Sequence, residues 1–251
     1  TPACYPTREQ SRALLRGNRS FVFTNPEFCL TLGGIYFVAW LLLTIGQSDM
    51  LANATAGARG LGSVLHAAGH IAWNTMGLPM FVVVAGVLGI SLFKYADEKS
   101  PKKKLLLSLP HFAIHLLLII ALVSILPPLN VALFGLVPGS GWSFWLTLTE
   151  FLIVGGFSGG AVWGAYLSIV CGRDGQHYND AFSAMRLDSY RHFLRMKITG
   201  DELVIYPIGI DQAPKRSGWT VNRKAMKDVQ TEAVYLPRVP LGEHLIEGPI
   251  V

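Results

Sequence analysis

The sequence predicts a mainly α-helical membrane protein with four transmembrane helices, both termini in the cytoplasm, and a small C-terminal β-hairpin region. Three observations predict this class. The 251 residues are 51% hydrophobic and only 15% charged, whereas a soluble domain carries about a quarter charged residues. Apolar stretches long enough to cross a bilayer recur along the chain. Lysine and arginine residues gather in alternate connections between these stretches.

Residues 1–24 form the first predicted segment, a basic stretch at the membrane interface. Three of its arginines recur every four residues, and these are Arg8, Arg12 and Arg16. This spacing places them on one face of a helix, as in amphipathic helices that lie on a membrane surface. The alternative is that they are topogenic charges on a short loop.

The transmembrane region is expected over residues 25–171, because a spanning helix needs about 20 mainly apolar residues. Asn25 and Pro26 suit the start of the first span as cap and first helical residue. The pair Pro127 and Pro128 is expected to end the third span. The four expected spans are about 28–46, 71–93, 105–126 and 144–171.

Basic residues set the predicted orientation. The connection from the third span to the fourth contains no lysine or arginine, whereas the preceding connection contains five lysines: Lys94, Lys99, Lys102, Lys103 and Lys104. By the positive-inside rule, both termini then lie in the cytoplasm, so we expect an integral protein of the bacterial inner membrane or an equivalent membrane. The net charge of +5 fits topology and anionic headgroups. The expected partner is therefore the lipid bilayer and not a nucleic acid.

The fourth span is rich in glycines at small-xxx-small spacing, a pattern that allows close approach of another helix. We expect this partner to be a helix of the same bundle, and a second protomer is the alternative. The glycines are Gly155, Gly156, Gly159, Gly160 and Gly164.

Residues 172–251 are the predicted cytoplasmic C-terminal region, where the composition becomes polar. A short helix is expected within 180–191. Two β-like runs, 192–198 and 202–210, are joined by Thr199-Gly200-Asp201, which is a hairpin signal. The tail from residue 212 onward is expected to be extended.

Two histidine pairs with i, i+4 spacing, His66/His70 and His111/His115, lie in or beside apolar stretches. Each pair shares one face of a helix and can offer two ligands to a metal ion. Glu150 lies in the fourth span at a depth within reach of His70 and His115. These three residues, with His66 and His111 one turn away, are the candidate ligands of a divalent metal. A proton relay and a hydrogen-bonded polar core are the alternatives, and bis-histidine haem is less favoured because the pairs lie at different depths.

Both ends of the chain resemble a known family. The run His177-Tyr-Asn-Asp-Ala-Phe-Ser-Ala-Met-Arg-Leu-Asp-Ser-Tyr-Arg-His-Phe-Leu-Arg-Met-Lys-Ile198, the run Leu203-Val-Ile-Tyr-Pro-Ile-Gly-Ile210 and the start Tyr5-Pro-Thr-Arg-Glu-Gln-Ser-Arg-Ala-Leu-Leu-Arg16 carry the resemblance. They resemble membrane-bound calcineurin-like metallophosphoesterases of bacteria and plants. The resemblance covers the ends better than the spans. It implies a hydrolase whose phosphoesterase domain precedes a multi-span region.

The resemblance assigns no catalytic residue, because the two-metal motifs DxH, GDxxD, GNH[DE] and GHxH of that family are missing from this chain. The chain is then expected to be the membrane portion, and whether it is itself part of an enzyme stays open. The resembling stretch contains the polar residues His177, Asn179, Asp180 and Arg186. We expect them to dock on the phosphoesterase domain or to line its entrance, with helix capping and headgroup contact as the alternative.

Two other functions stay open from the sequence. The chain could be a metal- or haem-binding membrane subunit of a redox complex, built on the histidine pairs. It could also be a structural membrane subunit without chemistry, held to another membrane subunit through the glycine face of the fourth span.

Overall fold

The computed structural model describes residues 3–223, 225 and 233–251. The chain divides into two compact units. The first, called here the membrane unit, is Gly17–Met185, and the second, the terminal unit, combines Thr1–Arg16 with Arg186–Val251. The two chain ends therefore belong to one unit, whereas the predicted segments were divided at residues 24 and 171.

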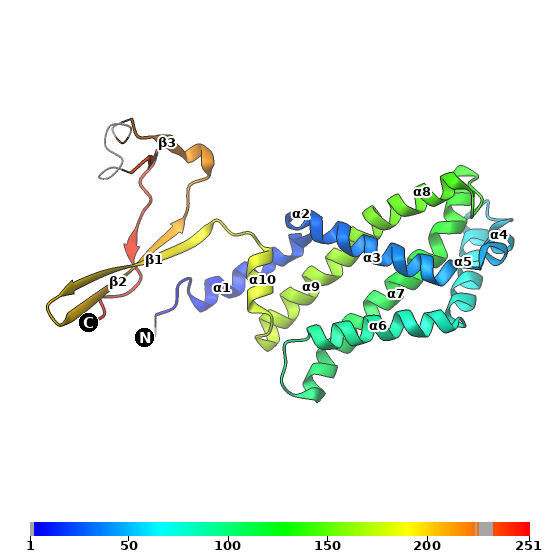
Figure 1. Cartoon of the computed structure of the whole chain (residues 1–251), viewed down its shortest axis with the longest axis horizontal. Coiled ribbons are helices and arrows are strands. Elements are labelled where there is room, and N and C mark those ends of the chain that lie inside the picture. Colours follow the sequence, from blue (N-terminus) through cyan, green and yellow to red (C-terminus); the bar gives the residue numbers. More distant parts are fainter. Residues whose placement is uncertain (1–2, 224, 226–232) are drawn as a thin grey trace. The chain divides into compact units, whose positions relative to one another are not determined.

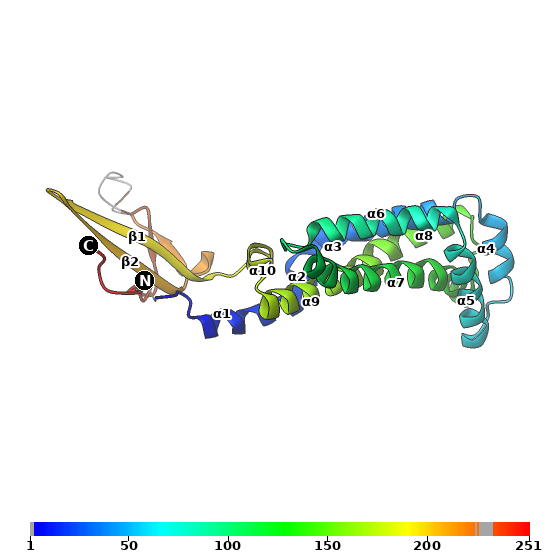
Figure 2. The same ribbon diagram turned by 90° about the horizontal axis from the view of Figure 1, so that it is seen from below.

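The membrane unit is helical, and α3, α6, α7 and α9 lie side by side (Figures 1 and 2). A π-helical turn, Phe151–Gly155, joins α8 to α9 in one continuous helical stretch. The elements are α2 (Phe21–Thr24), α3 (Pro26–Thr44), α4 (Ser48–Thr55), α5 (Leu61–Met76), α6 (Pro79–Tyr95), α7 (Pro101–Phe134), α8 (Gly141–Glu150), α9 (Gly156–Asp174) and α10 (Tyr178–Ala184).

Three helical stretches of the described chain are long and apolar enough to cross a membrane: α3, α7 and the continuous stretch Gly141–Asp174. A fourth crossing arises if the bent pair of α5 and α6 counts as one span. The predicted membrane class therefore holds, with three to four spans. The side on which the termini lie stays a prediction.

The second predicted span, 71–93, is wrong as a continuous helix. The chain bends by 80° between α5 and α6. Leu78 is extended, with φ −77° and ψ 139°, directly before Pro79 at the first turn of α6. A proline disfavours helical geometry in the residue before it and lacks the N–H that would continue the helix. The break therefore lies at Leu78-Pro79.

The third predicted span is longer than expected, because α7 continues through Pro127 and Pro128 to Phe134. Gly135, which caps this end, has the left-handed φ of 66°. Both prolines are buried. Packing of these rings against neighbouring helices offsets the lost backbone hydrogen bonds, as occurs in membrane helices. The expected end at residue 126 is therefore wrong.

The glycine face of α9 packs against α3 and its preceding turn. A Cβ atom added at Gly156 would overlap the carbonyl of Cys29, and one at Gly164 would overlap Asn18 and Phe21. The backbones thus approach more closely than any side chain allows. The prediction of a partner within the bundle is confirmed.

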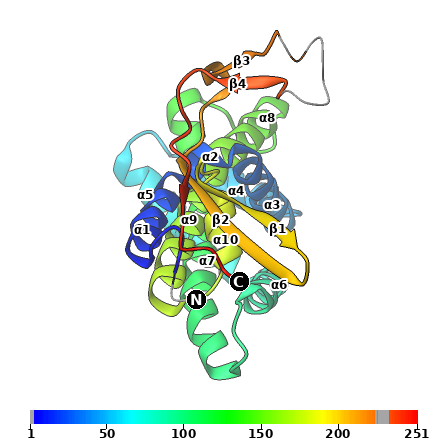
Figure 3. The ribbon, with the colours of Figure 1, turned by 90° about the vertical axis from the view of Figure 1, so that its left-hand side faces the viewer.

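The terminal unit contains α1 (Arg8–Leu14) and two small antiparallel sheets (Figure 3). The predicted hairpin is confirmed as β1 (Ser189–Thr199) and β2 (Glu202–Gln212), with Gly200 at the left-handed φ of 60° in the turn. The tail is not simply extended: β3 (Trp219–Val221) pairs with β4 (Tyr235–Pro237), and β5 (His244–Leu245) pairs with β2. A 3₁₀ segment at Leu15–Ser20 follows α1 and continues into the membrane unit, and a single 3₁₀ turn at Arg216–Gly218 precedes β3.

Candidate functional site

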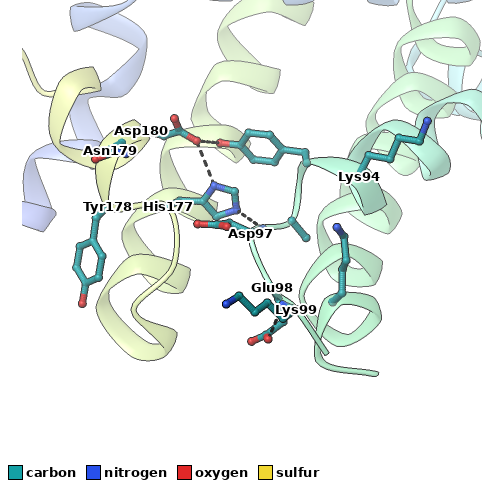
Figure 4. Close-up of a pocket in the computed structure, with 11 residues that line it drawn as sticks. Lys94, Asp97, Glu98, Lys99, His177, Tyr178, Asn179 and Asp180 are labelled. Atoms are coloured by element: carbon teal, nitrogen blue, oxygen red, sulfur yellow. Dashed lines mark hydrogen bonds and ion pairs between the residues drawn. The ribbon is translucent and has the colours of Figure 1, made fainter. Parts of the chain in front are cut away.

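A polar pocket of about 760 Å³ lies where the end of α6, the connection to α7 and the start of α10 meet (Figure 4). All of its lining belongs to the membrane unit. Charged and hydrogen-bonding side chains form most of the lining, and these are Lys94, Tyr95, Asp97, Glu98, Lys99, Lys104, His177, Tyr178, Asn179 and Asp180.

His177 is the buried centre of this pocket, with a side chain that is 3% exposed. Its Nδ1 lies 3.1 Å from Oδ2 of Asp180, and the backbone N–H of Asp97 donates to its Nε2 at 3.3 Å. Because a backbone N–H can only donate, Nε2 accepts. The neutral imidazole then carries its proton on Nδ1 and donates it to Asp180, so the network selects one tautomer.

Tyr95 ties the end of α6 to α10 through the same carboxylate. Its O–H donates to Oδ2 of Asp180 at 2.8 Å, and its ring stacks on the ring of His177 at 4.4 Å between centroids. Asp180 therefore accepts from two donors, and His177 is held both by stacking and by hydrogen bonds. His177 also has a left-handed φ of 58°, which costs a non-glycine residue about 1–2 kcal/mol. These contacts hold it in that conformation.

The acidic and basic groups at the rim differ in how they are partnered. Glu98 accepts from the backbone N–H groups of Lys99 at 2.7 Å and Ser100 at 3.0 Å. The N–H of Ser100 contributes most to lowering the pKa of this carboxyl, which stays ionised. Within the described part of the chain, the ammonium groups of Lys94, Lys99 and Lys104 have no carboxylate within 4.0 Å. In Figure 4, Lys94 extends away from His177.

A second polar group lies inside the bundle, among α3 and α7. Tyr36, His115 and His111 are 0%, 1% and 3% exposed. The hydroxyl of Tyr36 is hydrogen-bonded to Nδ1 of His115, and Nε2 of His115 lies 2.9 Å from Nε2 of His111. Buried polar groups in membrane helices are costly unless paired, and here each makes a hydrogen bond to the next.

Aromatic rings connect this buried group to the pocket. His111 stacks on Tyr166 of α9 at 4.0 Å between centroids, and the Tyr166 hydroxyl lies 3.4 Å from Nε2 of His177. Tyr36, His115 and His111 form an uninterrupted hydrogen-bonded line, in which each hydrogen bond polarises the next. The tyrosines were not among the site residues predicted from the sequence, although an amphipathic tyrosine in a span is a usable signal for a buried hydrogen bond.

The predicted metal cluster of His70, His115 and Glu150 does not form. His66 and His70 are exposed on α5, which the 80° bend directs away from the line of α6. Glu150 accepts a hydrogen bond from Asn130 at 2.8 Å. In residues 3–223, 225 and 233–251, no group of three or more His, Cys, Asp and Glu side chains could hold a metal ion. The other predicted ligand, His111, is bonded to His115 instead.

Of the predicted docking or entrance residues, three gather in the pocket: His177, Asn179 and Asp180. Arg186 belongs to the terminal unit and has a left-handed φ of 49°. The interpretation of these residues as a docking or entrance site stays a prediction.

Comparison of the chain with protein-family models, with curated proteins and with solved structures finds no match.

Proposed function

We propose that the chain is the membrane-embedded portion of a metal-dependent phosphoesterase, which anchors and positions a catalytic domain outside this chain. The observation that carries the proposal is that the N-terminal resembling stretch belongs to the same compact unit as most of the C-terminal one, from Arg186 onward. A catalytic domain attached at the N-terminal side would then be held against the hairpin that follows the membrane unit in sequence.

Tyr5 joins the two ends within the terminal unit. Its hydroxyl donates to Asp211 at 2.9 Å, and its ring packs edge-on against Tyr190 and His244 at 5.6 and 5.7 Å. Burial, with the hydrogen bond to Asp211, raises the pKa of Tyr5 to about 12. Tyr5 begins the N-terminal stretch that carries the resemblance, and Asp211 directly follows the run that ends at Ile210. The contact between them supports the proposal that the two stretches act together.

The first strand of the hairpin offers a surface for such a domain. β1 is 11 residues long and lies at the edge of its sheet. Long edge strands with exposed apolar side chains are usually covered in native proteins. The apolar side chains that are at least half exposed on β1 are Phe193, Leu194, Met196 and Ile198.

The two alternative functions have less support. Bis-histidine haem needs ligands on opposite sides of the iron, about 4 Å apart, whereas His111 and His115 are in direct hydrogen-bond contact at 2.9 Å. The structural-subunit hypothesis depended on the glycine face of the fourth span, and α3 of the same chain already covers that face.

The coding sequence that precedes Thr1 tests the proposal. We expect it to encode the two-metal motifs DxH, GDxxD, GNH[DE] and GHxH in the same reading frame. Metal analysis and an absorbance spectrum of the purified 251-residue chain supply the second test. A Soret band, or a transition metal bound in stoichiometric amount by this chain alone, would favour the redox-subunit alternative and count against the proposal.

Replacing Tyr5 by alanine should release the N-terminal segment from the sheet. Loss of its ring contacts and its hydrogen bond to Asp211 removes about 1–2 kcal/mol of stabilisation, so limited trypsin cleavage at Arg8 should accelerate by about tenfold. Tyr235→Ala is the matched control, because Tyr235 lies in the same unit and is 59% exposed. Equal cleavage rates in the two variants would show that Tyr5 does not hold the ends together.

A further inference from the structure

A second cavity lies within the membrane unit, between α3 and α6, and it is almost entirely apolar. Its volume is about 350 Å³, and α7 and α9 contribute His115 and Trp163 to its lining. On α6 the lining extends from Val83 to Tyr95, a length of about 18 Å along the helix. The lining is therefore elongated along α6, as a hydrocarbon chain lying along the helix requires.

The apolar cavity and the polar pocket share one side chain, that of Tyr95. On one side of Tyr95 the walls are apolar residues of α3 and α6. On the other side are the rim lysines, whose ammonium groups have no carboxylate within 4.0 Å in the described residues. The Lys104 ammonium lies over the ring of Phe93, 5.4 Å from its centroid. Apolar walls that end at cations without a carboxylate partner complement an amphipathic anion.

Two of the three carboxylates in the pocket lining already accept hydrogen bonds from groups other than the lysines. Asp180 is engaged by Tyr95 and His177, and Glu98 by backbone N–H groups. Asp97 is the third carboxylate of the lining. Lys99 and Lys104 come from the start of α7 and its preceding loop, so they give a bound anion two cations on the α7 side.

We propose that the two spaces form one binding site for a single-chain lipid phosphate, with the hydrocarbon chain between α3 and α6 and the phosphate at Lys99 and Lys104. This inference rests on the proposed function in one respect: a phosphoesterase held at the membrane would take a lipid-linked phosphate as its substrate. Binding itself is a property of this chain and is measured without any catalytic domain.

The test is equilibrium binding of radiolabelled dodecyl phosphate to the purified 251-residue chain in detergent, with protein-free micelles as the blank. Dodecanol and inorganic phosphate are the competitors that carry only one half of the ligand. We expect the binding of dodecyl phosphate to be saturable. Each competitor should need at least a tenfold higher concentration than unlabelled dodecyl phosphate to displace the radiolabelled ligand. Displacement by inorganic phosphate alone with equal potency would show a free-phosphate site and overturn the proposal.

Two pairs of variants separate the two halves of the site. Val87→Trp fills the apolar cavity and should weaken binding more than tenfold, whereas Val82→Trp, on the same helix but outside the lining, should leave it unchanged. Val82 and Val87 are 70% and 61% exposed, so both variants should fold.

The double variant Lys99→Gln/Lys104→Gln should weaken binding about tenfold. Lys102→Gln removes a neighbouring charge outside the pocket lining and is the matched control. Equal affinity in each variant and its control would overturn the proposal. Such a result would leave the proposed anchoring function intact, because that function is tested by the preceding coding sequence.

Discussion

Replacing Gly156 by leucine should strongly destabilise the membrane unit. A Cβ atom at this position would overlap the backbone carbonyl of Cys29 on α3, and backbone cannot move aside as a flexible side chain can. Overpacking a close contact costs about 1–3 kcal/mol and more when two helices must separate. Against a typical stability of about 5–15 kcal/mol, we expect a large fall in the thermal midpoint and loss of the monodisperse peak in detergent.

Gly86→Leu is the control for this result. Gly86 lies on α6, and an added Cβ atom would meet nothing within 4 Å. The two variants add the same side chain to an apolar helix, so they differ only in what the side chain contacts. Equal thermal midpoints for the two variants would mean that α3 and α9 are not in close contact at Gly156.

Replacing His115 by leucine should destabilise the bundle by about 2–5 kcal/mol. The hydroxyl of Tyr36 and Nε2 of His111 both lose their hydrogen-bond partner, and each unsatisfied buried polar group costs about 1–3 kcal/mol. Tyr36→Phe should cost less, because it leaves only the Nδ1 side of His115 unpaired. Thermal unfolding followed by far-UV circular dichroism measures both effects.

The double variant Tyr36→Phe/His115→Leu makes this result specific to the hydrogen bond. It removes both partners, so its destabilisation should be smaller than the sum of the single variants by about 1–2 kcal/mol. His70→Leu, at an exposed site on α5, should change stability little. Additive single variants, or a His115→Leu variant as stable as His70→Leu, would contradict the hydrogen-bonded line.

Hydrophobicity was sufficient to predict the membrane class and the first, third and fourth apolar stretches, because burial in lipid demands long apolar helices. It could not predict how proline acts within them. Pro79 breaks the second stretch, whereas Pro127 and Pro128 are accommodated within α7. The difference lies in the packing around each proline, which a single sequence does not contain.

The spacing of His111 and His115 correctly placed both imidazoles on one helix face, where they are hydrogen-bonded. Their partner could not be predicted, because residue depth in a span does not tell which way a helix face is turned. His115 is hydrogen-bonded to Tyr36 at the bundle centre and not to the predicted partner Glu150. Glu150 accepts a hydrogen bond from Asn130. Likewise, because of the 80° bend before Pro79, His70 lies on α5 outside the expected cluster.

The hairpin was predictable because its turn residues and alternating runs are local signals. The return of the tail to the same sheet at β5 and the packing of Tyr5 against Tyr190 were not, because they join residues far apart in sequence. The joining of the two chain ends, on which the proposed function depends, is therefore a result of the structure alone.

Phosphatase activity in washed membranes is the decisive measurement for the proposed function. The coding region that includes the sequence before Thr1 and the 251-residue chain alone are each produced in the same host, and hydrolysis of p-nitrophenyl phosphate and dodecyl phosphate is measured with and without a chelator. We predict divalent-metal-dependent hydrolysis that sediments with the membranes for the longer product and none above background for the chain alone. Activity that is soluble, or that is missing from the longer product, would mean that this chain does not anchor a phosphoesterase.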